Sequence, residues 1–454
     1  MKLELYPYKI VEVDGEKFLY TTNTSGVFAV DEDLMSILEA EGEDSDEAFE
    51  KLKNRMTYEK FSSLIQDMMD AQFIKGVESK NPPVKENLNK TLCSVTLMLA
   101  QKCNLRCTYC YGESGEYGDC GVMNLDVAIK AVDYLAKISK EKKLYVVFFG
   151  GEPLLKFDII KEVVAYCKRK EAEIDKKFFF SITTNGTLIN EEIEKFFIDN
   201  KFAVQISIDG TKEKHDLNRY DANHEGCYDK VIEKTANLRK KFAISARATA
   251  SKNNLDYVEI FEHLYSLGFV RITIATARNT LDEADFEKLL KEYKKYLWYF
   301  NYLVKKGDFH KACTMNDIIM PLRKFEYGSE RYLGCGVVRT MCAVDITGKI
   351  YPCHRFVSSK ECVIGNVNEG MTEKSNDFLN NTRVENHRQC KSCWVNNLCL
   401  GGCSNENYEY SGDITVSSER TCRFNKMLFE ELLKVYVGLT EHEKRKIFSV
   451  NPNL

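Results

Sequence analysis

Three of the seventeen cysteines stand within one short stretch, at Cys103, Cys107 and Cys110. They follow the apolar run 95–100, which is typical of a buried strand. Thiolates are soft ligands that suit zinc or an iron–sulfur cluster. An iron–sulfur cube usually takes four cysteines, so a set of three leaves one iron open for another ligand. Half of a zinc site is the alternative, although this spacing is not that of the usual zinc pair. The stretch predicts a strand that ends in a metal-binding loop.

The composition of the whole chain excludes several classes of protein. Its 454 residues are enough for two or three domains, and its apolar and charged fractions, 44% and 29%, are typical of a soluble globular protein. No apolar run approaches the roughly 18 residues of a membrane span, and the N-terminus does not resemble a signal peptide. A net charge of −4 offers no basic surface for nucleic acid. We therefore expect a cytoplasmic protein with no nucleic-acid or membrane partner, in a reducing compartment where clustered cysteines usually bind metal.

Strand and helix patterns alternate from residue 93 to about residue 310. Repeated strand–helix units predict a parallel sheet whose functional residues lie at the carboxyl ends of the strands. Two longer amphipathic helices are expected at 282–306 and 314–326, with residues 311–332 as a helical bridge. The candidate strands are 93–100, 144–149, 178–183, 203–208, 242–249 and 269–275, and the candidate helices between them are 124–139, 155–171, 190–200, 226–240 and 254–267.

The second of these strands ends in two glycines and a carboxylate. Gly150 and Gly151 would let a ligand approach the backbone closely. Glu152 could pair with an ammonium group. The alternative is a simple turn between strand and helix in which Glu152 caps the next helix.

Polar side chains follow the next strands as well. The third strand ends in Thr184 and Asn185, which could bind a ribose or a carboxylate, and the fourth ends near Ser207 and Asp209. Arg219 follows shortly afterwards and either meets a carboxylate or lies in solvent. On the fifth strand, Arg247 needs a partner because arginine is rarely buried alone.

Residues 1–80 read as a small separate domain. Alternating strands are expected at 8–13, 17–20 and 27–30, followed by helices at about 31–40, 45–55 and 57–71 and a short wing strand at 73–77. These elements predict a winged-helix-like module, with a linker at 81–84. Its many Asp and Glu residues argue against DNA, whose phosphates require Lys and Arg. A domain that only packs against its neighbour is the simpler alternative.

The remaining clustered cysteines lie between residues 335 and 422. In the first block, twelve residues separate Cys335 from Gly348, and four more separate Gly348 from Cys353. Cys342 belongs to a run that reads as a strand, so it is either a ligand or a buried thiol. A pair of zinc sites is an alternative for the region. The second block consists of Cys390, Cys393, Cys399, Cys403 and Cys422.

With the aromatic Tyr109 before its last cysteine, the motif formed by Cys103, Cys107 and Cys110 resembles that of the radical S-adenosylmethionine (radical SAM) enzymes. The resemblance implies that the three cysteines hold a [4Fe-4S] cluster whose fourth iron is chelated by SAM. It also implies an α/β fold with a partial (β/α)6 radical SAM barrel over residues 88–310. In this family Glu152 would hold the methionyl amine of SAM. The cofactor-binding residues implied in this way are Tyr109, Gly150, Gly151, Glu152, Thr184, Asn185, Ser207, Asp209 and Arg219.

Residues 333–425 resemble the SPASM domain, and a C-terminal helix is expected over 426–454. The resemblance implies two auxiliary [4Fe-4S] clusters, which makes three with the SAM-binding one. Cys342 could complete the inner cluster, or an iron could stay open there for a substrate thiolate. His354 stands where sulfatase-maturing relatives carry a catalytic Asp, so no catalytic residue is assigned. The implied ligands are Cys390, Cys393, Cys399 and Cys422 for the outer cluster, and Cys335, Cys353 and Cys403 for the inner one.

The N-terminal module resembles the leader-peptide recognition domain of peptide-modifying enzymes, in which an extended peptide adds a strand to the sheet. Taken together, the chain resembles the thioether-forming (sactisynthase-like) maturases of six-cysteine (SCIFF) peptides. This implies a ribosomally made, cysteine-rich precursor peptide with a leader segment as one partner, and an electron donor such as a flavodoxin or ferredoxin as another. Two alternatives stay open: another radical SAM–SPASM maturase, for carbon–carbon crosslinking or sulfatase-type oxidation, or a non-catalytic iron–sulfur or zinc protein.

Overall fold

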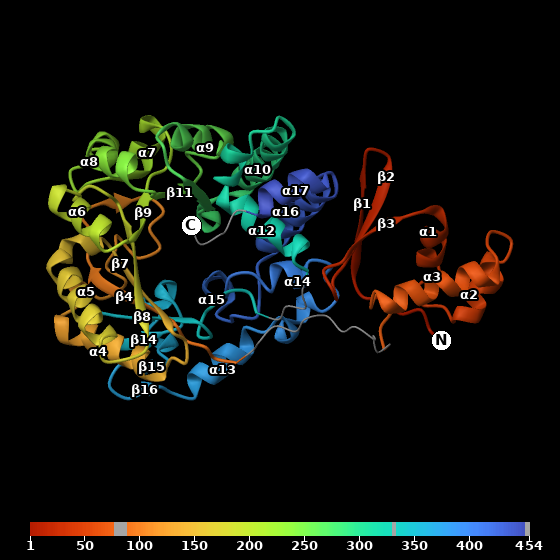
Figure 1. Cartoon of the computed structure of the whole chain (residues 1–454), viewed down its shortest axis with the longest axis horizontal. Helices are drawn as coiled ribbons and strands as arrows, with labels where there is room; N and C mark the ends of the chain where they lie inside the picture. The colour runs from red at the N-terminus through yellow and green to blue at the C-terminus, as the bar shows by residue number, and fades with distance from the viewer. Residues whose placement is uncertain (77–88, 329–332, 450–454) are drawn as a thin grey trace. The chain divides into compact units, whose positions relative to one another are not determined.

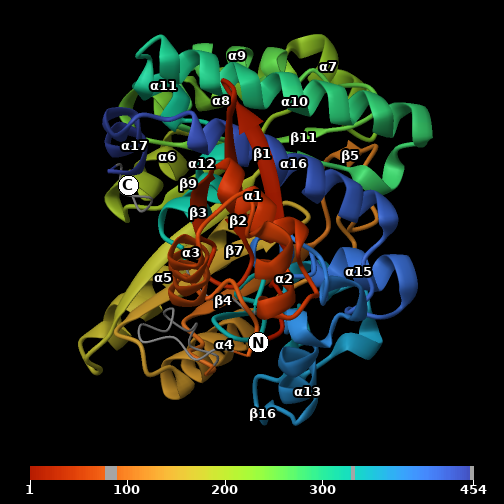
Figure 2. The same ribbon diagram turned by 90° about the vertical axis from the view of Figure 1, so that its right-hand side faces the viewer.

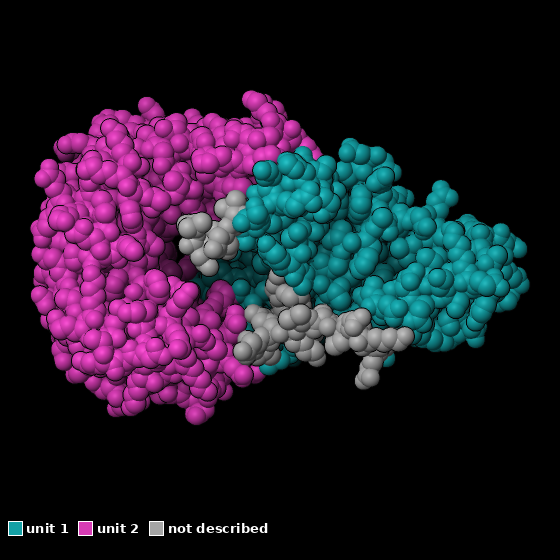
Figure 3. All heavy atoms as spheres, viewed as in Figure 1, with its two compact units in different colours: residues 1–88, 318–334, 381–454 teal, residues 89–317, 335–380 magenta. Residues whose placement is uncertain are grey.

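The computed structural model describes residues 1–76, 89–328 and 333–449. The chain forms two compact units, which Figure 3 colours separately. The predicted linker at 81–84 lies outside the described residues, and the predicted segment 333–425 contributes residues to both units. Unit 1 consists of Met1–Leu88, Ile318–Gly334 and Asn381–Leu454, and unit 2 of Asn89–Asp317 and Cys335–Asn380.

The N-terminal part of unit 1 is a three-stranded antiparallel sheet with three helices (Figure 1). Asp14 and Gly15 join the first two strands, and both have positive φ, as a tight two-residue hairpin turn requires. The predicted wing strand is reduced to one bridge between Leu5 and Ile74. The elements are β1 (Tyr8–Val13), β2 (Glu16–Thr21), β3 (Val27–Val30), α1 (Glu32–Glu39), α2 (Ser45–Leu52) and α3 (Tyr58–Asp70).

The C-terminal part of unit 1 is helical. The helix expected from residue 426 begins earlier, at Glu419, because the Ser418 side chain caps it by accepting the N–H of Thr421. This helix ends at Val437, and a second helix follows after the cap residue Thr440. The elements are α14 (Asn396–Cys399), α15 (Ser404–Ser411), α16 (Glu419–Val437) and α17 (Glu441–Phe448).

The centre of unit 2 is a sheet in which six strands run parallel in the spatial order β12-β11-β9-β8-β7-β4, which confirms the predicted fold class. Helices α4 to α9 lie around the outside of these strands (Figure 1). The strands are β4 (Ser94–Gln101), β7 (Lys143–Gly150), β8 (Lys177–Thr184), β9 (Ala203–Ser207), β11 (Ser245–Ala250) and β12 (Arg271–Thr276). The helices are α4 (Leu125–Ile138), α5 (Phe157–Glu171), α6 (Glu191–Asp199), α7 (Lys212–Asn218), α8 (Tyr228–Lys241) and α9 (Tyr257–Ser266).

The same sheet continues beyond β4 into a later part of the chain. Strand β13 (Met341–Val344) pairs parallel with β4 and places Cys342 opposite Val95. The sequence predicted a strand here but not its position beside the first barrel strand. Three short antiparallel strands complete the sheet: β14 (Lys349–Tyr351), β15 (Gly365–Asn366) and β16 (Gly370–Met371).

Long aromatic side chains of α10 (Glu283–Lys305) pack against α9, beside which α10 lies in Figures 1 and 2. Tyr293, Tyr296 and Phe300 are buried, whereas Trp298 and Tyr302 are exposed. The predicted bridge contains two helices, α11 (Phe309–Cys313) and α12 (Asn316–Glu326).

A stack of phenylalanine rings fills the layer between the sheet and its helices. Phe148 of β7, Phe180 of β8 and Phe202 lie with ring centroids 5.6–6.3 Å apart. The ring of Phe197 from α6 lies 5.0 Å from that of Phe202. Since each ring removes a large apolar area from water, this stack is a main source of the stability of unit 2.

The first prediction concerns this stack. Replacing Phe202, which is 2% exposed, by alanine leaves a cavity among the rings. We expect Phe202→Ala to lower the free energy of unfolding by about 3–5 kcal/mol, measured by urea denaturation. Phe179, 45% exposed on the same sheet, is the matched control, and Phe179→Ala should cost less than about 1 kcal/mol. Equal losses in the two variants would contradict this assignment of the core.

A second prediction concerns Asp317, which accepts a hydrogen bond from the Tyr296 hydroxyl at 3.2 Å. Burial raises the pKa of its carboxyl from 3.8 to about 7. Between these values the folded chain keeps a proton that the unfolded chain has lost, so stability falls as the pH rises from about 4 to about 7. We expect Asp317→Asn to remove up to about 4 kcal/mol of this pH dependence. Thermal melting of both proteins between about pH 4 and about pH 7 would test this expectation. An equal change of stability with pH in the two proteins would contradict it.

Candidate functional site

The cysteine-rich loop follows β4 and is held by a small sheet that the sequence did not predict. Strand β5 (Arg106–Cys107) pairs antiparallel with β10 (Arg219–Tyr220). This pairing places Arg219 directly opposite Cys107. Residues more than a hundred positions apart therefore meet at the loop, on the side where the parallel strands end.

Neighbouring donors surround the sulfur atoms of this loop. The Leu105 N–H points to the sulfur of Cys103 at 3.4 Å, and the Arg219 guanidinium points to that of Cys107 at 3.8 Å. Burial raises the pKa of Cys103 to about 12 and that of Cys107 to about 11. Both thiols are thus protonated at neutral pH, and a bound cationic metal would displace their protons.

The end of β7 fits closely against this loop. A side chain at Gly150 or Gly151 would collide with the carbonyl oxygen of Ala100 or Lys102. Gly115, within the following loop, approaches equally closely, since a Cβ there would lie 2.7 Å from Cys103 Cβ. The glycines are therefore required by backbone packing around the cysteines.

Glu152 is completely buried and links the ends of two strands. Its carboxylate accepts hydrogen bonds from the Thr184 hydroxyl at 2.7 Å and from the Asn185 backbone N–H at 2.8 Å. It also accepts from the Leu154 N–H at 3.0 Å, so it caps the short helix that follows, as the alternative interpretation expected. Burial raises its pKa to about 7 despite these three donors.

Asn185 connects the third strand end to the cysteine loop. Its side-chain amide donates to the side-chain oxygen Oδ1 of Asn104 at 2.9 Å and lies 4.0 Å from the sulfur of Cys103. Asn104 donates in turn to the Thr187 hydroxyl at 2.9 Å. The structure thus brings together Glu152, Thr184 and Asn185, three of the residues predicted from separate strand ends.

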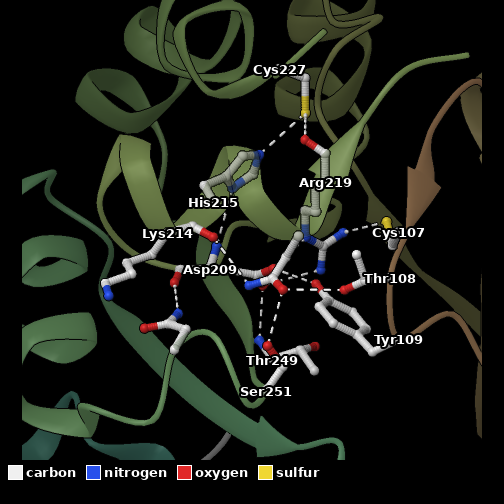
Figure 4. A network of polar contacts seen from close by, with 12 residues as sticks. Cys107, Thr108, Tyr109, Asp209, Lys214, His215, Arg219, Cys227, Thr249 and Ser251 are labelled. Atoms are coloured by element: carbon white, nitrogen blue, oxygen red, sulfur yellow. Dashed lines mark hydrogen bonds and ion pairs between the residues drawn. The ribbon is translucent and has the colours of Figure 1, made fainter. Parts of the chain in front are cut away.

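Asp209 and Arg219 form a buried ion pair beside the loop, as Figure 4 shows. The guanidinium donates to both carboxylate oxygens, at 2.9 and 3.3 Å. The Tyr109 hydroxyl also donates to this carboxylate, and the guanidinium lies 5.5 Å from the centre of the Tyr109 ring. Ser207 lies apart from this pair, on β9 opposite Arg247 of β11.

Sequence reasoning missed the polar residues that support this pair. The ring of His215 accepts the Asp209 backbone N–H at 3.3 Å, and the Asn254 amide donates to the Asp209 carbonyl. Both residues are almost completely buried. A buried polar side chain needs a partner, but His215 lies in a seven-residue helix and Asn254 in a turn, where no periodicity predicts burial.

The second group of cysteines lies in unit 1. The pKa of Cys390 is raised to about 12 by burial and by the nearby thiolates of Cys399, Cys393 and Cys422, so the four predicted outer ligands interact with one another. Asn425 donates to the sulfur of Cys399 at 3.2 Å. The predicted inner set is divided in the chain: Cys335 and Cys353 belong to unit 2, and Cys403 belongs to unit 1.

Cys342 is a buried thiol of β13, 1% exposed, and burial alone raises its pKa to about 12. The His354 ring packs 4.6 Å from that of Phe149. Burial and the charges of Arg355 and Arg247 lower its pKa to about 4, so His354 is a weak base.

Within 1–76, 89–328 and 333–449, no three His, Cys, Asp or Glu side chains are gathered tightly enough for a single metal ion. No helix in the same ranges is long and apolar enough to cross a membrane.

Comparison with known proteins places this site in a family. The Radical SAM superfamily matches residues 97–250, which include the cysteine loop and the ends of the first strands. A cysteine-type anaerobic sulfatase-maturating enzyme of Clostridium novyi (strain NT) is 29% identical over 378 residues, covering 77% of this chain and 98% of the relative.

Two solved structures show the same fold. Native anSMEcpe with bound AdoMet and Kp18Cys peptide superposes with a TM-score of 0.64 at 24% identity, covering 76% of this chain and 99% of the other. Streptococcus suis SuiB bound to precursor peptide SuiA gives 0.53 at 14% identity, covering 93% and 100%. Residues 97–250 therefore carry the radical SAM domain, and the chain is a radical SAM enzyme that is similar over most of its length to a sulfatase-maturating enzyme.

Proposed function

We propose that the chain modifies a ribosomally made, cysteine-rich precursor peptide by forming thioether bonds between cysteine sulfur and carbon. The observation that carries the proposal is the meeting of the cysteine loop with Glu152 and Asn185 at the strand ends. The relation to SuiB and to sulfatase-maturating enzymes supports a peptide as the substrate class.

Radical SAM enzymes use a [4Fe-4S] cluster and SAM, and Cys103, Cys107 and Cys110 would hold that cluster here. When bound, the cluster would supply an electron that splits SAM. The cleavage yields a radical able to remove hydrogen from an unactivated carbon. Glu152 would pair with the amine of SAM, because its carboxylate is buried among neutral donors. Thr184 and Ser207 are the proposed hydroxyl contacts.

Peptide recognition would occur on the sheet of unit 1. Among the strands of the described residues, β3 pairs with β2 alone, and its Phe28 and Ala29 are exposed. An extended leader segment can add a strand to such an edge through backbone hydrogen bonds. We propose residues 1–80 as this recognition domain.

Two auxiliary [4Fe-4S] clusters would carry away the second electron, in a SPASM domain over 333–425. The mutual interaction of the four outer cysteines supports the first of them. Cys342 is buried in strand β13, and we propose that it does not bind the inner cluster. That cluster would then be held by Cys335, Cys353 and Cys403, with one iron open for a substrate thiolate. A flavodoxin or ferredoxin in the cytoplasm would supply the first electron.

Sulfatase-type oxidation is the second candidate, favoured by the similarity to the Clostridium novyi enzyme. That reaction is expected to use an Asp where this chain has His354. A histidine whose pKa is about 4 is a poor proton acceptor, so the substitution favours the thioether reaction.

The activity prediction separates these reactions. Reconstituted enzyme with SAM, a reductant and a six-cysteine precursor peptide should lower the peptide mass by two hydrogens per bond. Each bond should also protect one cysteine from alkylation. A sulfatase-derived peptide should be unchanged under the same conditions. Loss of two hydrogens with every cysteine still alkylated would instead indicate a carbon–carbon crosslink and overturn the thioether assignment.

A matched variant tests the cluster assignment. Cys103→Ala should abolish SAM cleavage and remove about four of about twelve irons per chain. Cys167→Ala, which changes a buried thiol of α5 outside both cysteine groups, should retain the wild-type iron content and cleavage. Wild-type protein with zinc alone, or with only about four irons, would contradict three clusters.

A further inference from the structure

The carboxylate of Asp209 collects donors from three different parts of unit 2. Arg219 donates to both oxygens, the Tyr109 hydroxyl donates to Oδ2, and the Thr249 backbone N–H donates to Oδ1 at 2.9 Å. Asp209 is 0% exposed and Arg219 is 7% exposed. All of these contacts lie on one side of the cysteine loop (Figure 4). One carboxylate therefore ties the loop to the ends of β9 and β11.

Arg219 reaches the loop in two further ways. Its guanidinium donates toward the sulfur of Cys107 at 3.8 Å, and its backbone pairs with that of Cys107 across β5 and β10. Because arginine carries five N–H donors in a rigid fork, it can hold the Asp209 carboxylate and still direct one N–H to sulfur.

A second layer fixes both members of the pair from behind. His215 Nδ1 accepts the Asp209 N–H at 3.3 Å, so its Nε2 carries the proton and donates to the sulfur of Cys227 at 3.2 Å. Cys227 donates in turn to the Arg219 carbonyl at 3.6 Å. This layer closes a ring of contacts from Asp209 to Arg219 (Figure 4).

We infer that Asp209 and Arg219 act on the SAM-binding cluster as positioning residues: they hold Cys107 and Tyr109 in place, and Arg219 sets the cluster's reduction potential through the sulfur of Cys107. The inference rests on the proposed cluster. It adds a second role to the contact with SAM that the sequence led us to expect for these residues.

The physical effect has a definite sign. Hydrogen bonds to cluster sulfur and nearby positive charge favour the reduced, more negative cluster, and so raise its potential. Arg219 supplies both, and the carboxylate of Asp209 offsets the charge. Removing Arg219 should therefore lower the potential, whereas removing the charge of Asp209 should raise it.

The test is a redox titration of the full-length, reconstituted enzyme without SAM, using dithionite as reductant and electron paramagnetic resonance as readout. The signal of the SAM-binding cluster is identified as the one lost in Cys103→Ala. We expect Arg219→Gln to shift its midpoint potential downward and Asp209→Asn to shift it upward. Arg219→Lys keeps the positive charge but loses the forked guanidinium, so its midpoint potential should lie between those of wild type and Arg219→Gln.

Glu262→Gln is the control, because it breaks an ion pair with Lys311 (2.7 Å) elsewhere in unit 2 and should leave the potential unchanged. If Arg219→Gln does not fold, the midpoint potentials of the other two variants still test the inference. They should shift downward in Arg219→Lys and upward in Asp209→Asn. Unchanged potentials in these variants, or shifts in the same direction, would refute the inference. So would weaker SAM binding by Arg219→Gln at an unchanged potential. A wild-type protein without any SAM-responsive cluster would overturn the proposed function as well.

Discussion

Strand β4 is the constraint on which the site depends. It is paired with β7 on one side and with β13 on the other, and its residues from Val95 to Gln101 are buried. A strand fixed on both sides delivers the loop that follows it to one defined position, at the edge where parallel strands end. The glycines at the end of β7 then allow the backbone to close against this loop. Cys103, Cys107 and Cys110 are thus positioned by a buried strand that is paired on both sides.

The order and type of the long elements could be predicted from the sequence, because runs such as 144–149 and 178–183 are apolar and are followed by amphipathic helices. The pairing of β5 with β10 could not, since each strand has only two residues and no periodicity. For the same reason the sequence indicated Asp209 and Arg219 as separate candidates for a cofactor, whereas the fold joins them. Pairing over such a distance is decided by tertiary structure and leaves no local pattern.

The structure describes the surroundings of Cys342 and His354, two residues whose roles near the proposed inner cluster the sequence left open. Cys342 reads equally well as a ligand or as a core residue, because cysteine serves in both. Its strand lies between β4 and β14, where the thiol is shielded from water, and burial alone raises its pKa. His354 differs because it faces aromatic rings and two arginines, so its environment holds it neutral. Neither environment could be read from the residue type.

The two buried carboxylates at the strand ends differ in what compensates their charge. Asp209 has a guanidinium in contact with both of its oxygens. The described donors of Glu152, namely the Thr184 hydroxyl and two backbone N–H groups, are all neutral, and burial keeps its pKa near 7. Since burying an ionised group is costly without an opposite charge, a cation placed beside Glu152 gains more than one placed beside Asp209. This difference supports the proposed pairing of the SAM ammonium with Glu152 and the proposed role of Asp209 in organising the loop.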